Sequence, residues 1–277
     1  MNAENRIALL AAPGLLYLAA LYALPLALLL TESLRDAEGA LSLAAYVEFF
    51  ADPFNRGVLW RTLRVAALTT LLALALAYPT ALALSRARGW AQTAILVAMV
   101  LPLSVGVIVK AFAWSILFRA NGAINGALMG LGVIDAPIRM LFTETALIIG
   151  AANVFLPFMV LPIYAVMRQL SPALPEAAAT LGAGPFFRFF RVTLPLTLPG
   201  VIAGAAFTFS LSVSMYVIPS LIVGERQQTL SMLIARSFLF LRDEQLGATI
   251  SAILLLIAIA VVLGSSWLAA RVTGGRP

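Results

Sequence analysis

Cysteine and histidine are both absent from the 277 residues, and the sequence contains a single lysine, Lys110. Without cysteine or histidine the chain has no disulfide, no thiol nucleophile, no Cys/His zinc site and no histidine general base. Lys110 does not stand in a phosphate-binding G-x-x-x-x-G-K-[ST] motif, so the chain does not hydrolyse ATP by that route. We therefore expect a protein that is not an enzyme and that binds no metal or cofactor of its own.

Charged residues are also scarce. They make up 11% of the sequence, whereas hydrophobic residues make up 62%; a soluble domain carries about 25% charged residues. This composition predicts an integral membrane protein. The net charge of +6 does not indicate nucleic-acid binding, because the arginines are spread over loops and form no basic patch interleaved with aromatics. Loop arginines of a membrane protein are expected to face the cytoplasm and anionic lipid.

Six apolar stretches are long enough to cross the bilayer as helices, for which about 20 residues suffice. We therefore expect an all-α fold with six transmembrane helices and no appended soluble domain. The first stretch is too long for the apolar core of a cleaved signal peptide, and we expect it to be retained. The predicted spans are approximately residues 7–30, 62–84, 93–118, 141–166, 200–223 and 247–270.

An even number of spans places both termini on one side of the membrane. The arginines divide almost evenly between the two sides, so their count does not decide the orientation. Residues 32–58 are the most acidic part of the chain. The apolar pattern within them suggests a short amphipathic helix at the membrane interface, and a plain extracytoplasmic loop fits equally well.

In the second half of the sequence, the longest segment with polar and charged residues between two apolar runs is the loop 168–199. Pro175 favours helix entry, Glu176 lies in the first turn where a carboxylate suits the helix dipole, and Gly182 ends the helix. The residues between them are small, which gives a short helix with a smooth face. Four phenylalanines then bracket Arg188 and Arg191, as in a segment that rests at the membrane surface. These features fit a partner-docking helix or a simple interfacial helix.

The spacing in this loop resembles that of one transporter family. The sequence reads Glu176-Ala177-Ala178, then Gly182, then Val192-Thr193-Leu194-Pro195. The permeases of binding-protein-dependent, type I ABC importers carry the pattern E-A-A, three residues, G, nine residues, I-x-L-P between two spans. Valine for isoleucine is the one departure here. In that family the loop is the coupling helix that docks on a cytoplasmic ATPase.

The resemblance implies partners and a location. We expect a bacterial inner-membrane permease with cytoplasmic termini, paired with a second identical or homologous permease. Two ATPase subunits would bind ATP and Mg²⁺, and a periplasmic or surface binding protein would deliver the solute. The expected division is a first span and outer segment at 1–58, a permease core at 59–270 with coupling loop 169–199, and a cytoplasmic tail at 271–277. The residues assigned to ATPase coupling are Glu176, Ala177, Ala178, Gly182, Arg188, Leu194 and Pro195.

Residues 59–270 further resemble the permeases of spermidine/putrescine importers, as in Leu131-Gly132-Val133-Ile134-Asp135-Ala136-Pro137-Ile138-Arg139. Permeases for phosphonates, opines and ferric iron share much of this pattern. Lys110 would repel a polycation, so the residues by themselves do not indicate a polyamine.

Polar side chains inside the predicted spans are candidates for the solute pathway, because burying them in lipid is costly. Lys110 either lines the pathway or extends its amine to the interface, and Glu144 is its candidate partner or an entry-site acid. The serines of span five could equally bind neighbouring helices. The candidate pathway residues are Lys110, Trp114, Glu144, Asn153, Ser210, Ser212 and Tyr216.

Two other functions remain at this point. A secondary transporter or channel would usually carry an intramembrane acid or an inverted repeat, and neither is evident. A membrane assembly protein would show no ligand-stimulated ATPase activity in a reconstituted complex.

Overall fold

The computed structural model describes residues 12–35, 39–171, 173–272 and 274. These residues are overwhelmingly helical, and their one β-type contact is an isolated bridge between Arg35 and Leu41. The all-α prediction is therefore confirmed. The predicted start of the first span at residue 7 and most of the tail 271–277 lie outside the described residues.

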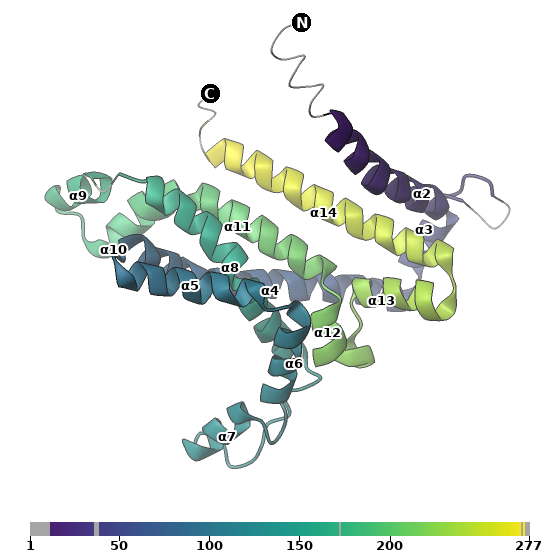
Figure 1. Cartoon of the computed structure of the whole chain (residues 1–277), viewed down its shortest axis with the longest axis horizontal. Helices are drawn as coiled ribbons and strands as arrows, with labels where there is room; N and C mark the ends of the chain where they lie inside the picture. The colour runs from purple at the N-terminus through teal and green to yellow at the C-terminus, as the bar shows by residue number, and fades with distance from the viewer. Residues whose placement is uncertain (1–11, 36–38, 172, 273, 275–277) are drawn as a thin grey trace, which may run out of the picture. The chain divides into compact units, whose positions relative to one another are not determined.

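Most of the described helices follow one another with short connections, and the longer segment 131–143 separates α7 from α8 (Figure 1). The α-helices are α2 (Leu24–Ser33), α3 (Ala44–Ala51), α4 (Pro53–Arg86), α5 (Trp90–Ser104), α6 (Val107–Leu117), α7 (Ala123–Gly130), α8 (Glu144–Gln169), α9 (Ala173–Thr180), α10 (Pro185–Arg188), α11 (Leu194–Ser214), α12 (Val217–Ile222), α13 (Leu230–Arg236) and α14 (Glu244–Val272). Shorter π- or 3₁₀-helical turns are η1 (Ala19–Ala23), η2 (Phe189–Thr193), η3 (Gly224–Gln227) and η4 (Ser237–Leu241).

Five continuous helical stretches among the described residues are long and apolar enough to cross a membrane, and a bent pair raises the number to six if it forms one span. The continuous stretches are Ala12–Ser33, Pro53–Arg86, Glu144–Gln169, Pro185–Ser214 and Glu244–Val272.

The third predicted span is not one straight helix. The chain bends by 101° between α5 and α6. Val105 and Gly106 have extended backbone angles there, with ψ of 123° and 145°. Pro102 lacks an amide hydrogen and Gly106 has a low helix propensity, which together favour a break at this point.

The fifth span begins and ends earlier than the sequence predicts. A continuous helical stretch runs from Pro185 to Ser214, so residues 185–199 extend the span instead of forming an irregular return. The π-helical turn η2 precedes Pro195, and Pro199 lies inside α11. A π-turn and membrane surroundings both allow a helix to accommodate proline, so the helix includes residues that were predicted to belong to the loop 168–199.

The described residues belong to two compact units, Met1–Gly57 with Leu233–Leu256 and Val58–Met232 with Ile257–Pro277. In the first unit, Phe49 of α3 is buried and the Ser33 and Tyr46 hydroxyls are 2.8 Å apart. The prediction of a short helix in the acidic segment therefore matches α3. Gln245 donates to the carbonyl of Arg35 within the same unit.

The second unit is built on α8, the most buried of the candidate spans, and α11 packs along it (Figure 1). Gly200 allows the close approach: a Cβ at this position would lie 2.8 Å from the Pro162 carbonyl oxygen. On α4, Ala73, Ala77 and Ala81 are fully buried in the cluster that contains the second half of α8. Their four-residue spacing gives α4 a narrow face of small side chains against which another helix can pack.

Candidate functional site

Helix α9 is short and exposed, as the sequence predicts. Before it, the Ser171 carbonyl accepts a hydrogen bond from the Leu174 amide at 3.3 Å, and the Ser171 hydroxyl accepts one from the Ala173 amide at 3.4 Å. Glu176 in the first turn is exposed and has no side-chain partner among the described residues. Its carboxylate is therefore free to meet a donor on another molecule, at the helix end where negative charge is favoured.

Gly182 ends α9 by a Schellman motif. The Ala183 amide donates to the Ala178 carbonyl and the Gly182 amide donates to the Ala179 carbonyl, both at 3.0 Å. A Schellman motif requires a residue with left-handed backbone angles just after the helix, and Gly182, with φ of +84°, is that residue. Glycine adopts this conformation without strain, so the fixed glycine in the pattern sets the length of the exposed helix.

The remaining coupling residues lie on both sides of this turn. Ala177 is exposed and Ala178 is half-buried, while Leu181 is 88% exposed beside Gly182. Leu194 is half-buried and Pro195 exposed at the start of α11. The exposed face of α9 is thus small and apolar with one carboxylate, which suits insertion into a groove.

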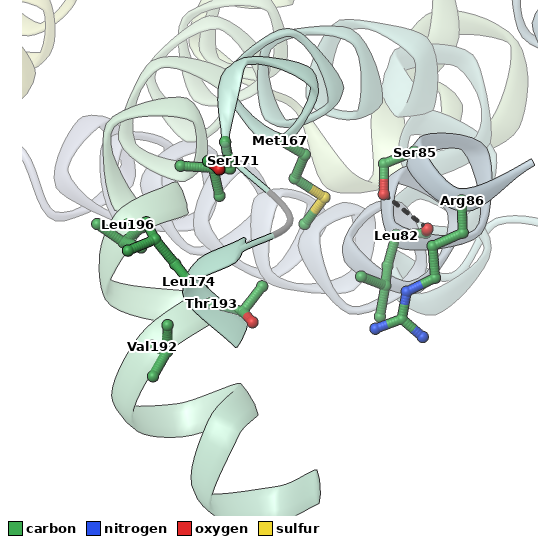
Figure 2. A pocket seen from close by; sticks show the side chains of 10 residues that line it. Leu82, Ser85, Arg86, Met167, Ser171, Leu174, Val192, Thr193 and Leu196 are labelled. Atoms are coloured by element: carbon green, nitrogen blue, oxygen red, sulfur yellow. Dashed lines mark hydrogen bonds between the residues drawn. The ribbon is translucent and has the colours of Figure 1, made fainter. Parts of the chain in front are cut away.

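A cavity of about 220 Å³ lies at the base of this loop (Figure 2). In the view, Leu82, Ser85 and Arg86 lie on one side, Met167 lies between, and residues from the start of α9 and from 192–196 lie on the other. Its lining residues are Leu82, Ser85, Arg86, Met167, Leu170, Ser171, Leu174, Val192, Thr193 and Leu196, and we call it the apolar cavity.

A second cavity of about 350 Å³ is lined by Arg86, Pro185, Arg188, Phe189 and Thr193, and we call it the arginine cavity. The Arg188 Nε is buried and has no hydrogen-bond partner. Arg188 is one of the residues predicted to act in ATPase coupling, whereas Arg86 is not among the predicted site residues. The signal available for Arg86 was its place in a short basic turn at the end of a span.

Among the candidate pathway residues, the structure brings Trp114 and Asn153 together. The Trp114 indole donates to the Asn153 side-chain oxygen at 3.1 Å, and its ring stacks on Phe118 with centroids 5.0 Å apart. Asn153 is exposed midway along α8. Gly150 lies one turn earlier, and a Cβ there would lie 3.7 Å from the Trp114 ring. The pair presents an amide and an aromatic face where α6 meets α8.

Lys110 and Glu144 are not partners. Arg64 binds the Glu144 carboxylate through two hydrogen bonds, from Nε to Oε1 at 2.9 Å and from Nη2 to Oε2. Lys110 is half-buried on α6, and the described residues provide no hydrogen-bond or ion-pair partner for its amine. The suggested pairing was wrong because Arg64, distant in sequence, lies within reach of Glu144.

The other pathway candidates do not join this pair. Ser210 and Ser212 have buried hydroxyls without a partner among the described residues. Ser210 lines a separate cavity of about 360 Å³ together with Phe207 and Val262. Tyr216 is 44% exposed and lies between α11 and α12.

Comparison with known proteins decides the family. A model described as "binding-protein-dependent transport system inner membrane component" matches residues 138–273. The spermidine/putrescine transport system permease protein PotB of Haemophilus influenzae is 33% identical over 220 residues, which cover 78% of this chain and 77% of that protein. The chain belongs to this family of transport-system inner membrane components.

Other members of the family agree with this assignment. PotB of Escherichia coli K12 is 34% identical over 79% of this chain and 80% of its own length. The molybdenum transport system permease protein ModB of Mycobacterium bovis is 30% identical over 76% of this chain and 79% of its own length. The family match at residues 138–273 includes α9 and the spacing from Glu176 to Pro195.

Solved structures share the fold at lower sequence identity. A chain of a bacterial alginate ABC transporter, in complex with an alginate-bound periplasmic protein, has a TM-score of 0.79 and 17% identity, with 97% of this chain and 95% of that chain covered. A chain of the inward-facing MetNI methionine ABC transporter has a TM-score of 0.58 and 18% identity, with 78% and 94% covered. These likenesses identify the ABC importer permease fold.

Proposed function

We propose that this chain is the permease subunit of an ATP-driven ABC importer and that α9 is the element through which it is driven. The observation that carries the proposal is the exposed α9 with its free Glu176 and its glycine-fixed end. Family membership supports it, because the family is described as the inner membrane component of binding-protein-dependent transport systems. The two proteins whose ABC transporter structures share the fold also act as assemblies.

The orientation follows from this role. An ATPase that hydrolyses cellular ATP lies in the cytoplasm, so α9 and the ends of α4 and α8 beside it belong on the cytoplasmic side. With the bent pair α5–α6 counted as one span, six spans place both termini on that side as well. A second permease, identical or homologous, would complete the pathway, since the candidate residues Trp114 and Asn153 lie on one chain and a pore needs a facing wall.

The driving step is a change in the relative stability of two conformations. ATP binding would bring two ATPases together, and each would carry a docked α9 with it. The work comes from the difference in binding free energy between the inward-facing and outward-facing states.

The solute is proposed to be a polyamine of the spermidine/putrescine type, because the spermidine/putrescine permeases of Haemophilus influenzae and Escherichia coli align over most of this chain. Trp114 could contact an ammonium group through its ring face, as aromatic rings do in other proteins. Uptake of radiolabelled putrescine by cells that express the complete transporter tests this part, and uptake of molybdate without putrescine would contradict it.

The coupling role is tested with the assembled transporter. We expect Glu176→Ala to reduce both co-purification of the ATPase and ligand-stimulated ATP hydrolysis about tenfold or more. Glu225→Ala is the matched control, because Glu225 is also an exposed acid but lies on η3 after α12. Uptake driven by an ion gradient without ATP would instead identify a secondary transporter.

A further inference from the structure

The two cavities beside α9 share part of their walls. Arg86 and Thr193 line both of them. The other residues of the apolar cavity are mostly leucines, with a valine and Met167, whereas those of the arginine cavity include Arg188. A ligand that occupied both spaces would need an apolar part joined to a polar part.

The charge in the arginine cavity is not balanced within the protein. No carboxylate lines the cavity, and the described residues provide no ion pair for Arg86 or Arg188. The Arg188 Nε is buried without an acceptor. A buried donor on a charged group is costly when unpaired, and two guanidinium groups around one space repel each other. A bound anion with several acceptor oxygens would remove both costs.

The chain itself has little to offer as that anion. Between Glu144 and Glu225 the sequence contains one acidic residue, Glu176, and between residues 53 and 134 it contains none. Glu176 lies on the exposed face of α9 and does not line either cavity. The missing negative charge must therefore come from another molecule.

The surroundings indicate that this molecule is a lipid. Phe186, Phe187 and Phe190 are 79%, 58% and 56% exposed in the same segment as Arg188. The Arg191 guanidinium carbon lies 5.9 Å from the centre of the Phe187 ring. Exposed aromatic rings next to arginines are typical of the membrane interface, where basic pockets between spans bind lipid head groups.

We propose that Arg86 and Arg188 bind the phosphate of an anionic phospholipid and that one of its acyl chains enters the apolar cavity. The site lies in the leaflet on the α9 side, and the cytoplasmic location of that leaflet rests on the proposed function. A lipid held there would touch the segments before and after α9, through Ser171 and Val192. The lipid would therefore brace the base of the coupling loop.

The test is lipid retention by the purified permease, measured by native mass spectrometry after exchange into defined mixtures of phosphatidylglycerol and phosphatidylcholine. We expect the Arg86→Gln/Arg188→Gln protein to retain phosphatidylglycerol at least about fivefold less than the unmodified protein. The matched control is Arg88→Gln/Arg168→Gln, which removes the same charge from two exposed arginines that line neither cavity. Equal losses in the two proteins would overturn the proposal, because they would reflect general surface charge.

Two further arms identify other occupants. Inorganic phosphate at millimolar concentration should not displace phosphatidylglycerol, and displacement would indicate a free-phosphate site. If the cavity variant retained lipid normally and lost only its ATPase, an acidic side chain of the ATPase would be the anion instead. If the double variant did not fold, Arg86→Gln alone would serve, with a smaller loss of retention expected. Retention needs no ATPase, so its outcome is independent of the test of coupling through Glu176.

Discussion

The two ends of α8 differ in whether the polar side chains near them have hydrogen-bond or ion-pair partners. At the N-terminal end, Thr143 caps the helix by accepting a hydrogen bond from the Ala146 amide, and Arg64 binds Glu144. At the C-terminal end, Arg86 and Arg188 line a cavity without an acid and Glu176 has no partner among the described residues. These polar groups of the first end are paired within the chain, whereas those named at the second end have no partner among the described residues.

Neighbouring contacts extend this contrast. Near the first end, Asn125 fixes the segment that leads into α8: its amide donates to the carbonyls of Arg119 and Ile138 and its oxygen accepts from the Ile138 amide. The Arg226 guanidinium carbon lies 5.9 Å from the Phe142 ring centre. Unmatched polar groups are costly in a folded protein, so the unpaired groups at the second end fit the ATPase and lipid binding proposed there.

The largest effect is expected when the Asn125 hydrogen bonds near the N-terminal end of α8 are removed. The Asn125 side chain is fully buried. Asn125→Ala leaves the Ile138 amide and two carbonyls without their partners, and we expect a loss of about 2–3 kcal/mol of unfolding free energy. Thermal unfolding in detergent measures this. Asn121→Ala is the control, since Asn121 is exposed four residues earlier. Equal shifts in the two proteins would show that the network contributes nothing.

The next largest effect is expected at the contact between α8 and α11. In Gly200→Ala the new methyl group would lie 2.8 Å from the Pro162 carbonyl oxygen and 3.0 Å from the Ile163 Cα, and backbone atoms cannot give way easily. We expect α8 and α11 to separate slightly, at a cost of about 1–3 kcal/mol. Gly264→Ala on α14 is matched, because its Cβ would meet nothing within 4 Å. A stable Gly200→Ala protein with unchanged activity would contradict the packing described here.

A smaller effect on stability is expected at Gly182, which ends α9. Gly182→Ala forces alanine into a left-handed conformation at a local cost of about 1 kcal/mol. We expect the last turn of α9 to loosen, so that ligand-stimulated ATPase activity of the assembled transporter falls several-fold while the unfolding temperature of the permease changes little. Gly184→Ala should be nearly silent, because Gly184 has φ of −66° and ψ of 164°, which alanine adopts readily. Similar activities for the two variants would show that the end of α9 is not used in docking.

The smallest effect is expected from the exposed ion pair at the first end. The Arg64 and Glu144 side chains are 46% and 21% exposed, so water and salt screen their attraction. Arg64→Gln should lower the unfolding temperature by no more than about 2 °C. A double-mutant cycle with Glu144→Gln measures the coupling, which should shrink at high salt. A coupling free energy that did not change with salt concentration would show that the pair is shielded from water.

Local signals predicted much of the permease fold. Composition indicated the membrane class, and the lengths of apolar runs located the spans 144–169 and 244–272 to within about three residues, whereas the span 53–86 starts nine residues before its predicted start at 62. The small residues after Pro175 and the glycine at 182 predicted α9 and its end, because helix propensity and capping act within a few residues. Pairings between distant residues were not predictable in the same way. The Arg64–Glu144 pair joins residues 80 positions apart, and the Trp114–Asn153 bond joins residues 39 apart.

By itself, the sequence determined that the chain is built largely of membrane-length apolar helices and that a short helix before Gly182 follows α8, since burial in lipid and helix capping depend on local composition. Only the tertiary structure decided that the third apolar run bends by 101°, that the fifth helix starts at Pro185, and that Glu144 binds Arg64 instead of Lys110. It also decided that Arg86 and Arg188, a hundred residues apart, line one cavity. These outcomes depend on which helix faces meet, and that is set by contacts between segments distant in sequence within the unit that contains α8.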